Sequence, residues 1–90
     1  MNAAEICRQA ADLVSGDRKD THGDTTRNHQ NIARLWSAYL DVPVTPDQVA
    51  MMMVLLKVAR TKSGAFNIDD FRDMAGYAGC AGEIRGKMEG

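Results

Sequence analysis

The sequence predicts an all-α protein: a compact four-helix bundle-like domain over residues 1–90 that works as an oligomer. Apolar residues recur at helical spacing in four segments, and each segment is bounded by a cap or breaker residue. One of these helices is apolar on all sides in a chain of only 90 residues. Such a helix needs cover that so small a domain can hardly supply alone, and this predicts self-association.

The first two helices are predicted from their apolar stripes and their ends. A helix over 3–14 stops before Gly16, and a second begins near Asp24 or Thr25, either of which can cap it. Pro43 ends the second helix, because it has no amide hydrogen to donate. The apolar stripe of this second helix is expected to be core and consists of Ile32, Leu35, Trp36, Tyr39 and Leu40.

The third helix has the strongest local start signal, Thr45-Pro46-Asp47-Gln48, with a Thr cap, Pro at the first position and Gln completing a capping box. Its next residues, 49–56, are apolar all round and include Met51–Met53, which we expect in the core or in an oligomer seam.

A fourth helix is predicted to start after Asn67 and to run antiparallel to the third. Small residues on it allow another helix to approach closely; they are Ala75, Ala78, Gly79 and Gly82.

The net charge, the absence of a recognisable targeting segment and the cysteines limit which partners and which location we expect. The net charge of −1 gives no general attraction to a polyanion, which argues against duplex nucleic acid as the main partner. No secretion signal or membrane span is recognisable, so we expect a cytoplasmic protein. Cys7 and Cys80 have no partner at metal-ligand spacing and are expected to be buried thiols.

Two groups of residues suit the binding of an anion. The first is a polar loop that leads into a helix N-terminus and contains Asp17, Arg18, His22, Gly23, Asp24 and Asn28. The alternative is a solvated turn with caps. The second group is Lys57 with Arg60, which share a helix face and can hold a phosphate. Alternatively, they complement the helix dipole or extend into solvent.

A third group is acidic. Asp69, Asp70 and Asp73 open the fourth helix, with Tyr77 one turn beyond, and a pair of these carboxylates can hold Mg²⁺. Matching of the helix dipole explains Asp69 and Asp70 equally well, but it does not extend to Asp73. Trp36 and Tyr39 are expected in the core, with a base-stacking role only if one edge is exposed.

Together these patterns resemble a small uncharacterised domain family of phages and prophages, over residues 16–83. The matching residues are Arg18, His22-Gly23-Asp24, Asn28, 35–40, 49–52, 56–60 and the stretch from Asp70 through Gly76-Tyr77-Ala78. That family is in turn distantly similar to MazG-like all-α nucleotide pyrophosphohydrolases, oligomers that hold Mg²⁺ with acidic residues on two helices. Asp70-x-x-Asp73 resembles the later acidic pair, but the earlier Glu-Glu-x-x-Glu is missing.

Three functions follow as hypotheses. The first is an oligomer, with no cofactor, that binds a small phosphorylated nucleotide at a site bordering the subunit surfaces, and in a phage setting sequesters a host defence signal. Its binding residues would be Arg18, His22, Gly23, Asn28, Lys57, Arg60 and Tyr77. The second is a Mg²⁺-dependent pyrophosphohydrolase with Asp69, Asp70 and Asp73 as ligands. The third is a protein-interaction module with a Met-rich face.

Overall fold

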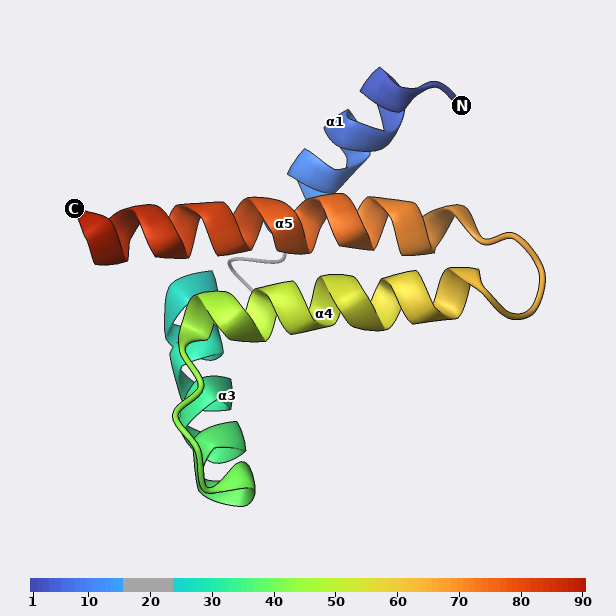
Figure 1. Cartoon of the computed structure of the whole chain (residues 1–90). Coiled ribbons are helices and arrows are strands. Elements are labelled where there is room, and N and C mark those ends of the chain that lie inside the picture. Colours follow the sequence, from blue (N-terminus) through green and yellow to red (C-terminus); the bar gives the residue numbers. More distant parts are fainter. Residues whose placement is uncertain (16–23) are drawn as a thin grey trace.

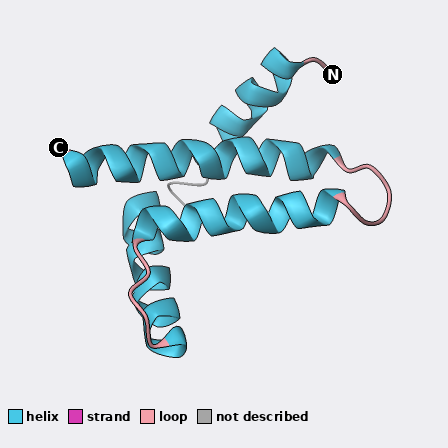
Figure 2. Ribbon diagram, in the orientation of Figure 1, coloured by secondary structure: helices cyan, strands magenta, loops and turns pink. Residues whose placement is uncertain are grey.

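The computed structural model describes residues 1–15 and 24–90, and these residues form four helices and no strand (Figures 1 and 2). The predicted residues Arg18, His22 and Gly23 lie outside the described residues. The helices are α1 (Ala3–Val14), α3 (Thr25–Leu40), α4 (Pro46–Thr61) and α5 (Ile68–Glu89). For the residues that the structure describes, the all-α prediction and the four predicted helices are confirmed.

The centre of the fold is a hairpin of α4 and α5, which run antiparallel and make the most extensive contact between helices (Figure 1). Helix α1 packs against α5, and α3 crosses the hairpin close to the start of α4. The antiparallel pairing was predicted correctly. The other two helices lie at steep angles to the hairpin, so the arrangement differs from a bundle of four aligned helices.

The helix starts follow the local signals. Asp24 accepts from the amide of Arg27 at 3.3 Å, and Asn67 accepts from that of Asp69 at 3.0 Å. At the start of α4, the amide of Thr45 donates to Gln48 Oε1 at 3.0 Å. These caps satisfy amides that have no partner inside the helix, which explains why the starts could be predicted.

The buried core is small and consists mainly of short side chains. Ala50 of α4 packs with Cys80 and Ala81 of α5, and Val14 of α1 lies against them. Short side chains let the two long helices approach closely. The prediction that Cys80 is buried is confirmed, whereas Cys7 is exposed, because it lies on the outer side of α1.

The expectation that the whole apolar stripe of α3 is core was wrong. Leu35 is 70% exposed, Tyr39 is 88% exposed, and Leu40 is also exposed. Because α3 crosses the hairpin, its C-terminal half extends past α4 and α5, while its N-terminal half packs on them (Figure 1). Ile32 and Trp36 are half-buried.

Helix α4 keeps an uncovered apolar face. Val49 and Ala50 are buried against the other helices, and Met53 is half-buried. The large side chains on the opposite side are exposed; they are Met51, Met52, Leu55, Leu56 and Val58. This face is the one for which an oligomer was predicted, and self-association stays a prediction.

Another helix lies close to a glycine of α5 at a position that differs from the predicted ones. A Cβ on Gly76 would lie 3.2 Å from Val14 Cγ1, whereas one on Gly79 or Gly82 would meet nothing within 4 Å. Among the glycines of α5, Gly76 is therefore the one at which another helix of the chain lies close. None of the described helices is both long enough and apolar enough to cross a membrane.

Candidate functional site

A cavity of about 500 Å³ lies where the four helices meet. Its walls are mostly apolar, and they include two aromatic rings, those of Trp36 and Tyr77. The remaining apolar lining comes from Leu13, Val14, Ile32, Val49, Met53, Gly76 and Cys80. A cavity of this size with apolar walls and a few polar groups is typical of a small-molecule site.

Helix α3 supplies most of the polar lining from its N-terminal half: Thr25, Asn28, His29 and Asn31. Asp24 caps this end of the helix, so the first turn is held in place next to the cavity. The ring of His29 is buried, and its Nδ1 lies 2.8 Å from the carbonyl oxygen of Thr25. This contact orients the imidazole along α3.

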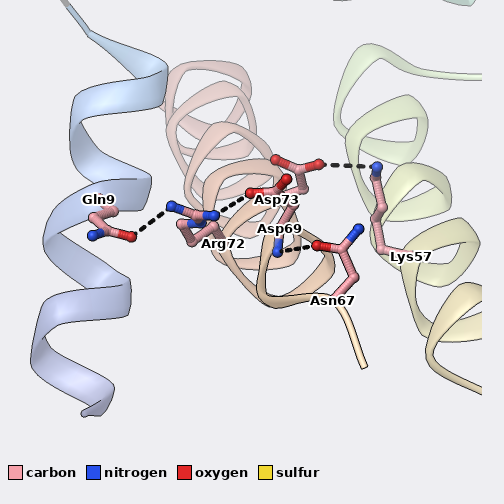
Figure 3. Close-up of polar contacts among 6 residues, drawn as sticks. All are labelled: Gln9, Lys57, Asn67, Asp69, Arg72 and Asp73. Carbon is pink, nitrogen blue, oxygen red and sulfur yellow. Dashed lines mark hydrogen bonds and ion pairs between the residues drawn. The ribbon is translucent and has the colours of Figure 1, made fainter. Parts of the chain in front are cut away.

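Helix α5 supplies Arg72 and Asp73, which are neighbours in sequence but face different helices (Figure 3). Arg72 Nη1 donates to Gln9 Oε1 on α1 at 2.8 Å, and its guanidinium also pairs with Asp69. Asp73 Oδ2 lies 2.9 Å from Lys57 Nζ on α4. The two charged residues therefore tie α5 to both of its neighbours at the edge of the cavity.

The structure brings together part of the predicted site. Asn28, Asp73 and Tyr77 all line the cavity, although they come from two of the separate groups recognised in the sequence. Lys57 joins them through its ion pair with Asp73. Arg60 is exposed, three residues further along α4, and is not part of the lining.

The acidic residues predicted as metal ligands face in different directions. Asp69 pairs with Arg72 and Asp73 with Lys57, while Asp70 is buried. In residues 1–15 and 24–90, no group of three or more His, Cys, Asp or Glu side chains is placed to hold a metal ion. The Asp73 pair joins α5 to α4, whereas the Asp69 pair lies within α5.

Sequence reasoning did not identify His29 and Arg72 as site residues. His29 precedes Ile32 and Ala33 by three and four residues, so helical spacing already placed it on the inner stripe of α3. The spacing of Asp69 and Arg72 also indicates a local ion pair. The contact of Arg72 with Gln9 spans 63 positions of the chain, and no local pattern reveals it.

Comparison with known proteins places the chain in a family. Residues 5–85 match the family described as "Domain of unknown function (DUF6378)". The "Gene 55 protein" of Mycobacterium phage D29 is 40% identical over 79 residues, which cover 88% of this chain and 52% of that protein. The "Gene 55 protein" of Mycobacterium phage L5 is 44% identical over 75 residues, which cover 82% and 48%.

The chain spans about half the length of these two relatives. No solved structure matches it. The matches confirm the resemblance to an uncharacterised phage domain family and give no support to the further similarity to MazG-like enzymes. The chain belongs to the DUF6378 family, whose relatives described here are phage proteins.

Proposed function

We propose that the protein binds a nucleotide or a nucleotide-derived signal, with the base and sugar in the cavity between the four helices. The observation that carries this proposal is the lining: Trp36 and Tyr77 with apolar neighbours, next to the amide of Asn28 and the imidazole of His29. Aromatic rings stack on any base, at about 1–3 kcal/mol per base, and amide and imidazole groups hydrogen-bond to base edges. Sequestration of a host signal is the role that we assign to such binding.

The phosphates would lie at the edge of the cavity, where Lys57 is the nearest described cation of the predicted set. Because Asp73 already neutralises Lys57, a phosphate has to replace this carboxylate as the partner. The other proposed phosphate contacts are Arg18 and His22. Both lie outside the described residues. Arg60, which is exposed, is the remaining candidate.

Hydrolysis by a MazG-like mechanism is the weaker proposal. It needs several carboxylates directed at one Mg²⁺ ion. Two of the three candidates, Asp69 and Asp73, are instead paired with cations on different sides of α5. The ion pairs thus favour binding over metal-dependent cleavage.

We also propose that the protein self-associates through the exposed apolar face of α4. Burying the exposed apolar side chains of α4 against a partner would contribute about 25 cal/mol for each Å² that is covered. A second copy presents the same face, so a symmetric contact between two α4 helices would cover both at once. The same face supports the third hypothesis, a protein-interaction module, if the partner is another protein.

The only tryptophan of the chain allows a direct test, because Trp36 lines the cavity. Its fluorescence should change on titration with ribonucleoside triphosphates or cyclic nucleotides, and calorimetry should give the same affinity. Tyr77→Ala should weaken binding about tenfold, which corresponds to about 1.4 kcal/mol of lost stacking.

The matched control is Tyr39→Ala, because Tyr39 is exposed and does not line the cavity. It should bind like the wild type. If no nucleotide of the panel binds, or if both variants lose affinity equally, the proposed function is wrong.

A further inference from the structure

We propose that His29 is the recognition residue of the cavity, and that its Nε2 accepts a hydrogen bond from an N–H or O–H donor of the bound nucleoside. This inference rests on the proposed function and adds to it: it names the group that distinguishes one nucleoside from another. His29 was not among the residues predicted from the sequence.

The tautomer of His29 follows from its contact with Thr25. Nδ1 lies 2.8 Å from the carbonyl oxygen of Thr25, and a carbonyl oxygen can only accept a hydrogen bond. Nδ1 must therefore carry a proton. In the neutral imidazole the other nitrogen, Nε2, then has a lone pair and acts as an acceptor.

This acceptor belongs to a residue that lines the cavity. His29 is only 8% exposed, and it lines the cavity. Within residues 1–15 and 24–90, Nε2 makes no hydrogen bond. In the same residues, the one solvent-inaccessible side-chain N or O atom without a hydrogen-bond partner is Arg72 Nε. Among the described residues, Nε2 of His29 therefore has no hydrogen-bond partner, and the ring that carries it lines the cavity.

The surroundings make this acceptor selective. The rings of Trp36 and Tyr77 contact any base by stacking and distinguish bases poorly. A buried acceptor forms a hydrogen bond only with a donor at the right position, and a ligand without such a donor leaves the acceptor unsatisfied at a cost in free energy. In a nucleoside the donors are the amino or imino groups of the base and the hydroxyls of the sugar, so selectivity should depend on one of these groups.

Two substitutions separate the functions of the two ring nitrogens. In His29→Asn the side-chain amide can still donate to the Thr25 carbonyl from the position of Nδ1, but no atom remains at Nε2. In His29→Gln the longer side chain places a carboxamide near Nε2 and offers an acceptor there. The first variant should lose recognition, and the second should restore much of it.

The test is titration of Trp36 fluorescence with ATP, GTP, CTP and UTP and with their 2′-deoxy analogues. Purine riboside triphosphate and ITP serve as analogues of ATP and GTP that lack the amino group. We expect His29→Asn to weaken the tightest-binding nucleotide about tenfold or more, and His29→Gln to stay within about threefold of the wild type. Removing the recognised donor from the nucleotide should weaken binding to the wild type about as much and should not affect His29→Asn further.

A second measurement needs no variant. The ring nitrogens of His29 in wild-type protein can be observed by ¹H–¹⁵N NMR, in which we expect a protonated Nδ1 and an Nε2 resonance that shifts on titration with the tightest-binding nucleotide. A proton on Nε2 instead of Nδ1 overturns the inference, as does wild-type affinity in His29→Asn. In either case nucleotide binding itself would stand, whereas failure of every nucleotide to bind the wild type overturns the proposed function and this inference together.

Discussion

Lys57 of α4 and Asp73 of α5 form an ion pair with 2.9 Å between Nζ and Oδ2, at the edge of the cavity (Figure 3). Each belongs to a different group of candidate site residues in the sequence, one cationic and one acidic. Their pairing brings the two groups together and makes each residue less available to a ligand. A paired lysine is a weaker phosphate ligand than a free one, and a paired aspartate is a weaker metal ligand.

The first prediction concerns Asp73→Asn. The substitution keeps the shape of the side chain but releases Lys57, so the edge of the cavity becomes more positive. We expect nucleoside triphosphates to bind several-fold more tightly, with a steeper salt dependence, in titrations of Trp36 fluorescence. Stability should fall by no more than about 1 kcal/mol, because the pair is partly exposed.

The control for this prediction is Glu89→Gln, which removes an exposed carboxylate whose partner, Arg85, does not line the cavity. It should leave the affinity for nucleotides nearly unchanged. The hydrolysis hypothesis predicts the opposite for Asp73→Asn, namely loss of Mg²⁺-dependent pyrophosphate release. An Asp73→Asn protein that loses such an activity would refute the binding-only role of this pair.

The second prediction concerns Asp47, a buried carboxylate at the start of α4. The Thr45 hydroxyl donates to it at 2.6 Å and lowers the pKa of Asp47 below its usual value of 3.8, and Arg85 adds to this effect against the opposing influence of burial. A lowered pKa in the folded state means that the carboxylate stabilises the fold above pH 3.8. This contribution is lost as the pH falls through the folded-state pKa.

We therefore expect Asp47→Asn to lower the free energy of unfolding by about 1 kcal/mol at neutral pH, measured by urea denaturation. The difference from the wild type should shrink as the pH falls below 3.8. Glu89→Gln is the control, because Glu89 also pairs with Arg85 but is exposed, and it should have little effect. A deficit in Asp47→Asn that persists unchanged at low pH would contradict this explanation.

The helices could be predicted because their ends are encoded locally. The caps at Asp24, Thr45 and Asn67 all lie within three residues of the amides or side chains that they contact. The angle between α3 and the hairpin depends on packing between distant segments. An apolar stripe predicts that a face is available for burial, but it does not predict how far along the helix the burial extends, which is why Leu35 and Tyr39 were misassigned.

The candidate site was predictable only in part, for the same reason. Asn28, Asp73 and Tyr77 were recognised from their residue types and spacing. Their convergence on one cavity needs the crossing of α3 over the hairpin, which no local pattern contains. The cavity lining from His29 and Arg72 became visible only in three dimensions, through a carbonyl contact in one case and a contact with α1 in the other.

The third prediction uses the glycines of α5. Gly82→Ala should stabilise the monomeric fold by up to about 1 kcal/mol, because alanine is the better helix former and its Cβ meets nothing within 4 Å. Gly76→Ala should stabilise less or even destabilise, since its Cβ would lie 3.2 Å from Val14 Cγ1. Thermal unfolding followed by circular dichroism gives both values.

Gly76→Ala should also be made in a Val14→Ala protein, because Val14→Ala removes the Cγ1 atom that the new Cβ would contact. The two substitutions together should cost less than the sum of their separate effects. Strictly additive effects would show that Val14 does not limit the space at Gly76.

The last prediction concerns the exposed face of α4, where Leu55 is 63% exposed. Leu55→Lys should leave the helix content and the melting temperature of the monomer nearly unchanged, because the side chain buries little within the chain. If a second copy covers this face, the substitution places a charge in the contact and should shift the protein to monomers in sedimentation analysis. The matched control is Leu35→Lys on α3, which is as exposed but lies on another helix and should preserve self-association. A wild-type protein that stays monomeric at high concentration would refute self-association through this face of α4.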